Sequence, residues 1–125
     1  MKKSILIIIF ILLTVSSYAG KYSTTVNAAD EYGNTPLSTA IYNENLDMIK
    51  LLLNNKMDPN TVTDEYYGTT LFMWAISRDD NELAKLLIKK GANVNSLNYQ
   101  NLSVLGYTQN TETIKFLLNN GLDPN

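Results

Sequence analysis

Leucine-rich stretches recur along the chain, and each ends on a similar short motif that contains Asn. Three of these stretches close with Met57–Asn60, Ala92–Asn95 and Leu122–Asn125, and the pair Val26-Asn27 stands before the first. The steps between the closing Asn residues are 33 (27 to 60), 35 (60 to 95) and 30 (95 to 125). A period near 33 is typical of small helix–turn–helix repeats, so the pattern predicts a solenoid of stacked helix pairs.

The first complete unit begins at Asp30, and its residues predict a turn followed by two helices. Gly33 suits a turn that needs a positive φ, and Thr35 can cap a helix that has Pro36 at its first position. A second helix is expected after Asn45, which would cap it. Apolar residues recur at helical spacing on both helices, at Leu37, Ala40, Ile41, Met48, Ile49, Leu52 and Leu53. One unit cannot bury these stripes alone, so neighbouring units must stack.

The second and third units repeat this pattern with unequal lengths. Unit two matches unit one at an offset of 35, and its two extra residues precede Gly68, around Thr63 and Asp64. Unit three lacks three residues between its matching leucines, since positions 37 to 52 span 15 residues and positions 105 to 117 span 12. We therefore expect an enlarged turn in unit two and a short first helix in unit three, which Gly106 weakens further.

Two motifs carry a resemblance to a known family: the run Gly33–Leu37, and the pair Leu86-Leu87 followed by Gly91–Asn95. On these residues the chain resembles the ankyrin repeat family over about residues 26–125. Tetratricopeptide repeats have a similar period but lack this turn signature. The resemblance implies an all-α solenoid of about three helix–turn–helix units with projecting turns, at about 30–62, 63–97 and 98–125. The chain departs from the family pattern where Leu71 replaces Pro, Lys56 and Asn101 replace Gly, and Ser38, Met73 and Gly106 replace His.

The resemblance also implies a mode of action. Ankyrin repeats are similar to one another in having no catalytic centre, and they bind proteins through projecting turns and the groove face of the first helices. No cofactor or metal is implied. Carried over by position, the partner-binding residues are Glu31, Tyr32, Asn34, Tyr42, Asn43, Tyr66, Tyr67, Thr69, Ser77, Arg78, Tyr99 and Gln100.

Aromatic residues dominate this set, which contains five of the seven tyrosines that follow residue 20. Tyrosine offers a large contact area, a hydrogen-bonding hydroxyl and few rotatable bonds, so binding surfaces favour it. Two interpretations stay open: the tyrosines line a groove that grips a protein partner, or they pack against adjacent turns. Trp74, on the first helix of unit two, is expected to pack between helix layers rather than to contact a ligand.

Composition and charge narrow the functional classes. The 125 residues carry ten basic and twelve acidic side chains, and no basic run exceeds two residues, so nothing indicates nucleic-acid binding. The chain has no Cys and no His, which excludes disulfides, thiol and imidazole catalysis and most zinc sites. The acidic pairs Asp79-Asp80 and Asp64-Glu65 fall in predicted turns, where solvated carboxylates and helix caps are the ordinary outcome. Residues 79–82 lack the spacing and the Gly of a calcium loop.

The N-terminus fits a secretory signal peptide. Lys2 and Lys3 precede an apolar stretch, Ile5–Val15, and small residues follow at Ser17 and Ala19. We expect cleavage near Ala19, which defines a signal peptide at 1–19 and a short segment at 20–25. An uncleaved membrane anchor is the alternative, but a spanning helix needs ~20 apolar residues. The expected product is exported to the periplasm of a bacterium or secreted, and touches the membrane only transiently.

The leading hypothesis is an exported, non-enzymatic protein-interaction module. The alternative is a periplasmic accessory subunit that protects or inhibits an enzyme, whereas no constellation supports a hydrolase that uses carboxylates alone. Unit three presents Ile114, Phe116, Leu117 and Leu118 near the end of the stack. Because terminal repeats normally need a polar outer face, we expect marginal stability or self-association through this unit, unless the chain is part of a longer repeat protein.

Overall fold

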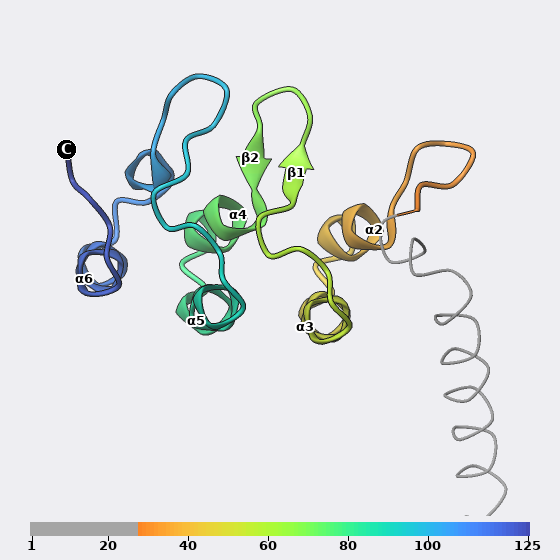
Figure 1. The fold of residues 1–125 in the computed structure, drawn as a ribbon, viewed down its shortest axis with the longest axis horizontal. Helices are drawn as coiled ribbons and strands as arrows, with labels where there is room; N and C mark the ends of the chain where they lie inside the picture. Colours follow the sequence, from red (N-terminus) through yellow and green to blue (C-terminus); the bar gives the residue numbers. More distant parts are fainter. Residues whose placement is uncertain (1–27) are drawn as a thin grey trace, which may run out of the picture.

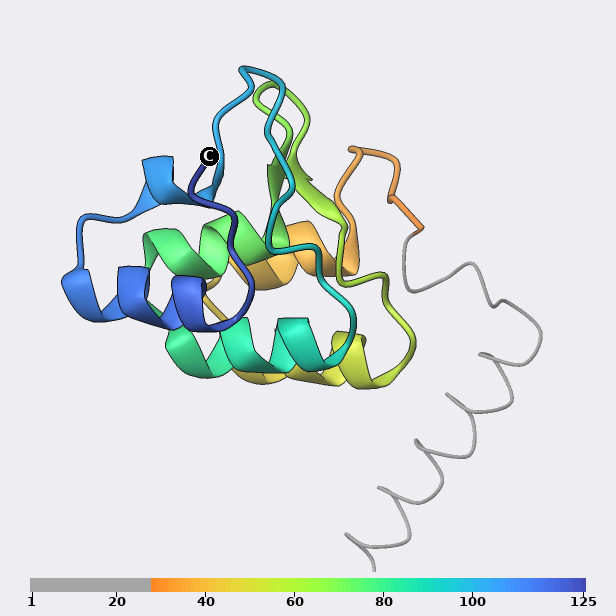
Figure 2. The same ribbon diagram turned by 60° about the vertical axis from the view of Figure 1, so that its left-hand side comes forward.

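Helix pairs stacked side by side make up the part of the chain that the computed structural model describes, residues 28–125 (Figure 1). The first pair is α2 (Pro36–Tyr42) and α3 (Leu46–Asn54), and the second is α4 (Leu71–Ser77) and α5 (Asn81–Lys89). The first helices form one layer and the second helices form the other. The turns project beyond the layer of first helices (Figures 1 and 2).

The third pair is the short one. A single 3-10 turn, η1 (Val104–Tyr107), takes the place of the first α-helix and precedes α6 (Thr111–Asn119). The structure therefore confirms the helical solenoid of three units and the shortened first helix of unit three.

The expected signal peptide (1–19), the segment that follows it and the pair Val26-Asn27 lie outside the described residues. From residue 28 onward, no helix has the length and apolar character needed to cross a membrane.

Polar side chains cap the helices at the positions expected from the sequence. Thr35 Oγ1 accepts a hydrogen bond from Ser38 N at 3.1 Å, and Ser38 Oγ accepts one from Thr35 N at 2.8 Å. This reciprocal capping box has Pro36 as the first helical residue. Asn45 Oδ1 accepts from Met48 N at 3.0 Å and caps α3 with this single bond. Ser38, which stands where the family pattern has His, thus completes a helix cap.

The turn of unit two is a short antiparallel hairpin of β1 (Val62–Asp64) and β2 (Thr69–Thr70). Val62 pairs with Thr70 and Asp64 pairs with Thr69, so the register shifts between the two pairs. An extra residue in one strand is accommodated by such a bulge. The hairpin lies where the sequence predicted an enlarged turn.

Left-handed backbone occurs at the turn positions that the family pattern assigns to Gly. Gly33 has φ +84° and Gly68 has φ +68°. Lys56 and Asn101, which replace Gly, keep the left-handed conformation, with φ values of +68° and +59°. Asn adopts this region more readily than other side chains, whereas a residue such as Lys loses roughly 1–2 kcal/mol in it.

The hydrophobic core lies between the two helix layers and is tightest in unit two, which has a neighbour on each side. The side chains there are fully shielded from solvent at Leu71, Met73, Ala75, Ile76, Leu83, Ala84 and Leu87. In unit one, Leu51 is 55% exposed and Met48 is 40% exposed. Stacking therefore supplies the burial that a single unit lacks.

Asparagine side chains at the ends of units one and two bind the main chain of the following unit. Asn60 Oδ1 accepts from Asn93 N at 2.7 Å, and its Nδ2 donates to Gly91 O at 3.3 Å. Asn95 makes the same pair of bonds one unit later, to Asp123 N at 2.7 Å and Gly121 O at 3.0 Å. Two of the recurrent Asn residues of the sequence, Asn60 and Asn95, thus join neighbouring units.

Candidate partner-binding surface

The turn of unit one is closed by the carboxylate of Asp30. Its Oδ1 accepts hydrogen bonds from the backbone N–H groups of Tyr32 at 2.9 Å and Asn34 at 2.8 Å, and its Oδ2 accepts from Asn34 Nδ2 at 3.1 Å. Because these bonds favour the charged form, they hold the pKa of Asp30 below its ordinary value, with the Asn34 side chain as the main cause. Glu31 and Tyr32 occupy the tip, where Tyr32 is 81% exposed.

The tip of unit two is built in a related way. Asp64 Oδ1 accepts from Tyr66 N at 2.9 Å, and Gly68 N donates to Asp64 O at 2.8 Å. Tyr66 is 91% exposed, and the neighbouring Tyr67 is 54% exposed. Glu65 precedes them and is also exposed. Units one and two therefore present a Glu-Tyr pair at matching places.

The turn of unit three is closed by Asn98, which is buried. Asn98 Oδ1 accepts from Gln100 N and from Leu102 N, each at 2.9 Å. Its Nδ2 donates to Tyr107 Oη at 2.8 Å, and this hydroxyl also lies 3.2 Å from Thr69 Oγ1 of unit two. A single amide thus closes its own turn and joins a network that reaches the neighbouring hairpin.

A second contact joins the turns of units two and three, which lie side by side in Figure 2. Tyr99 N donates to Tyr67 O at 2.8 Å. The Tyr99 ring packs against Gly68 so closely that a Cβ atom on Gly68 would overlap it. Tyr99 is still 67% exposed, so one part of the ring packs and the rest faces solvent.

A hollow of about 470 Å³ runs along the first helix of unit one. It is lined by Asn34, Ser38, Thr39 and Tyr42. Ser38 and Tyr42 are four residues apart, so they lie on one face of α2, and Asn34 belongs to the turn before the helix. Tyr42 is 88% exposed at the far end of the helix. The hollow offers neutral polar groups and an aromatic ring to a partner.

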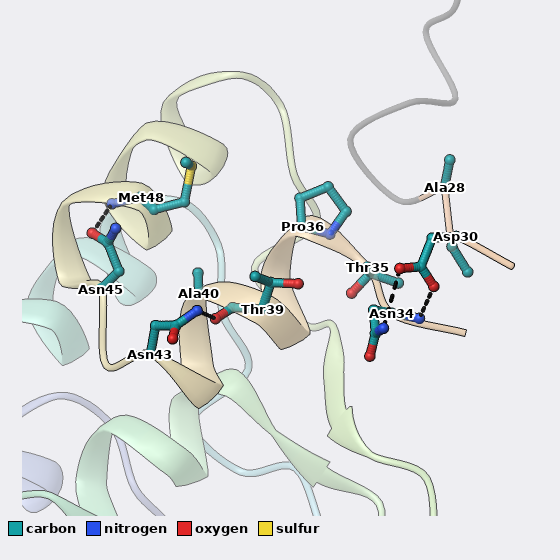
Figure 3. A pocket seen from close by; sticks show the side chains of 11 residues that line it. Ala28, Asp30, Asn34, Thr35, Pro36, Thr39, Ala40, Asn43, Asn45 and Met48 are labelled. Carbon is teal, nitrogen blue, oxygen red and sulfur yellow. Dashed lines mark hydrogen bonds between the residues drawn. The ribbon is translucent and has the colours of Figure 1, made fainter. Parts of the chain in front are cut away.

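A second cavity, of about 420 Å³, opens on the end of the stack formed by α2 and α3 (Figure 3). Pro36, Ala40 and Met48 give it an apolar wall, and Asn43 and Asn45 lie at its edge. Both amides are engaged, since Asn43 Nδ2 donates to Thr39 O at 2.9 Å and Asn45 caps α3. Its lining contains one ionisable side chain, Asp30, which the turn already uses. The cavity can accept an apolar group but offers no acid–base pair.

The predicted binding residues fall into two groups. Glu31, Tyr32, Asn34, Tyr66, Tyr67, Thr69, Tyr99 and Gln100 belong to the turns. Tyr42, Asn43, Ser77 and Arg78 lie at the C-terminal ends of α2 and α4, one helix length away from the turns. For a helix of seven residues that separation is about 10 Å. Sequence reasoning missed Ser38 and Thr39, although both lie on the first helix of unit one, between the predicted binding residues Asn34 and Tyr42.

Arg78 has structural contacts. Its Nη1 donates to Glu44 Oε1 at 3.0 Å, and its guanidinium lies 5.1 Å from the centroid of the Trp74 ring. Trp74 is partly buried and packs against the core, as expected from the sequence. Arg78 therefore links the loop of unit one to unit two, and a partner would meet it already paired.

The acidic pair Asp79-Asp80 also holds the units together. Asp80 Oδ1 accepts from Leu83 N at 3.0 Å and caps α5. Asp79 Oδ1 accepts from the hydroxyls of Thr108 and Thr113, each at 2.9 Å, in unit three. The Thr108 hydroxyl, followed by that of Thr113, keeps the pKa of Asp79 below its ordinary value. Across residues 28–125, no three or more acidic side chains gather into a group that could hold a metal ion.

Comparison with known proteins identifies relatives of this repeat stack. A family model described as "Ankyrin repeats (3 copies)" matches residues 8–98 and 58–125. Two ankyrin repeat proteins of Acanthamoeba polyphaga mimivirus are similar: one is 33% identical over 85 residues (68% of this chain, 22% of the relative) and the other 32% over 103 residues (80% and 13%). An ankyrin repeat protein of Fowlpox virus (strain NVSL) is 34% identical over 88 residues (70% and 12%). The chain thus spans a fifth or less of most of these relatives.

Proposed function

Because the chain belongs to the ankyrin repeat family, we propose that it is a non-enzymatic module that binds a protein partner through its turns and first-helix face. Ankyrin repeats generally mediate protein–protein interaction. The observation that carries the proposal is the exposure of large aromatic side chains on this side of the stack. Tyr32, Tyr42 and Tyr66 are 81%, 88% and 91% exposed, although burial of such rings is normally favourable.

Site-specific photo-crosslinking tests this binding mode. A benzophenone amino acid is introduced in place of Tyr32, Tyr42 or Tyr66, and the purified protein is irradiated with an extract of its own organism. Control protein carries the same group in place of Leu51, which is 55% exposed on α3, on the opposite layer. We expect a discrete protein adduct from the turn and first-helix positions only. Equal adducts from position 51, or none from the three tyrosine positions, would contradict the proposal.

We also propose that the protein is exported and loses residues 1–19. The support is the order of Lys2-Lys3, the apolar stretch Ile5–Val15 and the small residues Ser17 and Ala19. The family match begins at residue 8, inside this stretch, so the segment has a competing interpretation as part of a repeat. The intact mass of protein recovered from periplasm and medium decides between them. We expect an N-terminus at Gly20, with uncleaved precursor when Ala19→Arg is introduced; a protein that keeps Met1 would overturn the export proposal.

Self-association through unit three is the remaining proposal about partners. Leu118 on α6 is 45% exposed, and Leu102 in the preceding turn is 47% exposed. Sedimentation of residues 20–125 should show a concentration-dependent increase in mass that Leu118→Lys removes. Leu51→Lys is the matched control, since it places the same charge at an exposed leucine of α3. A monomer at all concentrations would refute the proposal.

A further inference from the structure

The exposed turn tips of units one and two share one chemical pattern. The pair Glu31-Tyr32 and the run Glu65–Tyr67 stand at the tips, and we call these five residues the turn-tip surface. The backbone beneath each tip is held by a carboxylate, through Asp30 to Tyr32 N and through Asp64 to Tyr66 N. The side chains of the turn-tip surface are therefore displayed by ordered turns, which lowers the entropy lost on binding.

Charge is unevenly distributed between the turns and the second helices. The turn segments 28–35, 61–70 and 96–103 contain no Lys or Arg and carry four acidic residues, Asp30, Glu31, Asp64 and Glu65. The second helices and their C-terminal ends (46–56, 81–90 and 111–120) carry six Lys and three acidic residues. The turn side is therefore negative, and the opposite layer is positive.

Two of the four carboxylates in the turns, those of Glu31 and Glu65, are free to bind a partner. Asp30 is used by its own turn, and one oxygen of Asp64 accepts from Tyr66 N. Glu31 and Glu65 are exposed, and neither forms an ion pair or side-chain hydrogen bond with any residue between 28 and 125. Each is followed directly in the sequence by an exposed tyrosine.

We propose that the turn-tip surface binds an extended, Lys- or Arg-rich segment of the partner protein, an inference that rests on the proposed function. A cation over a tyrosine face is attracted by the ring, and an adjacent carboxylate adds Coulomb attraction. Stacked helices lie about 8–10 Å apart, so neighbouring tips are spaced by about three residues of an extended chain. One basic side chain can therefore reach each tip. Phosphate-bearing partners are disfavoured, because the same carboxylates repel them.

Peptide binding tests this chemistry directly. The probes are three fluorescent peptides of about twelve residues, long enough to span both tips, with Lys, Gln or Glu at every third position and Ser elsewhere. We expect the Lys peptide to bind residues 20–125 at least about tenfold more tightly than the Gln peptide at low salt, and the Glu peptide not to bind. Raising the salt concentration to about 0.3 M should remove most of that preference, because exposed charges are screened.

Matched variants place the effect at the turn tips. Glu31→Gln with Glu65→Gln should weaken binding of the Lys peptide about tenfold. Glu82→Gln with Glu112→Gln makes the same change in net charge on α5 and α6, and should weaken it less than about twofold. Tyr32→Leu with Tyr66→Leu should also weaken binding, whereas the Phe versions keep the ring and should retain it. Unfolding curves of every variant verify that the stack is intact.

The outcomes separate this inference from the proposed function. Equal affinity for Lys and Gln peptides, or equal losses in the two charge-matched double variants, overturns the inference. If crosslinks from the tyrosine positions then still capture a protein partner, the proposed function stands without it. If no position on the turn side crosslinks, the proposed function fails as well.

Discussion

The turns of units one and three have the same hydrogen bonds in two different environments. In each, the first side chain accepts from the backbone N–H groups two and four residues later: Asp30 in unit one and Asn98 in unit three. Asp30 is exposed, whereas Asn98 is only 4% exposed and donates a hydrogen bond to the Tyr107 hydroxyl. The local sequence specifies the shape of both turns, and the neighbouring unit decides how much each contributes to stability.

The same comparison separates the tyrosines by role. The backbone N–H of Tyr99 donates a hydrogen bond to Tyr67 O in the turn of unit two, and the Tyr99 ring packs on Gly68. Tyr32, in the corresponding turn of unit one, is 81% exposed. Rings that look alike in the sequence thus divide into one that joins two units and others that remain available to a partner.

The largest difference should come from the two turn glycines. Gly68→Ala would push a Cβ atom into the Tyr99 ring, while the same atom on Gly33 meets nothing within 4 Å. Both positions have positive φ, so each loses about 1 kcal/mol from the backbone. We expect Gly68→Ala to lose roughly 2–4 kcal/mol in total, measured by urea unfolding. Equal losses at the two glycines would show that the turns are not coupled.

Removal of the closing side chains should give the next largest difference. Asn98→Ala removes a buried side chain and leaves the partly buried amide bonds of Gln100 and Leu102 without their acceptor, so we expect a loss of roughly 1–3 kcal/mol. Asp30→Ala frees the equivalent amides where water can replace the carboxylate, so the midpoint of unfolding should move much less. Urea titrations of both variants make the measurement, and a larger loss for Asp30→Ala would reverse our interpretation.

A single hydroxyl tests the network between turns two and three. Tyr107→Phe removes the oxygen that accepts from Asn98 and lies 3.2 Å from Thr69 Oγ1. We expect a loss of about 1 kcal/mol. Tyr32→Phe is the matched control in turn one, where the exposed hydroxyl should be replaceable with no measurable change in Tm. An unchanged free energy of unfolding for Tyr107→Phe would mean that the Tyr107 hydroxyl does not stabilise the contact between the turns.

The smallest expected effect is a pH dependence confined to turn one. The pKa of Asp30 is lowered in the folded protein, so its contribution is present above the ordinary pKa of an aspartate and is lost as pH falls through the folded value. The amides of Tyr32 and Asn34 should therefore lose hydrogen-exchange protection below about pH 4, while those of Gln100 and Leu102 should not. Asp30→Asn should abolish the change. The pKa of Asp79 is lowered too, but Asp79 is present in both the unchanged protein and Asp30→Asn. The difference in exchange between these two proteins therefore reports on Asp30 alone.

Most of the helical architecture could be predicted from local signals. Thr35 and Asn45 cap the helices as expected, Gly33 has a positive φ, and the missing residues of unit three reduce its first helix to η1. Each of these features depends on residues close together in the sequence. The period of the sequence predicted the stacking of units, because a repeated pattern implies that every unit presents equivalent faces to its neighbours.

The contacts between turns could not be predicted in this way. The packing of Tyr99 on Gly68 joins residues 31 positions apart, and only the stacked geometry brings them together. The hydrogen bonds that connect Asn98 to Tyr107, and the Tyr107 hydroxyl to Thr69, likewise join residues that local propensity does not relate. The division of the predicted binding residues into turn and helix-end groups follows from the length of α2 and α4.

The Asn60 and Asn95 side chains have a consequence for how such chains evolve. The bonds of Asn60 reach Gly91, 31 residues away, and those of Asn95 reach Gly121, 26 residues away, yet both pairs bind the same two kinds of main-chain atom. These bonds do not involve the side chains of the following unit. Insertions and deletions in the intervening turn and first helix therefore leave the contact between units unchanged. Recognition surfaces can therefore diversify in length and composition on a scaffold whose spacing is inherited intact.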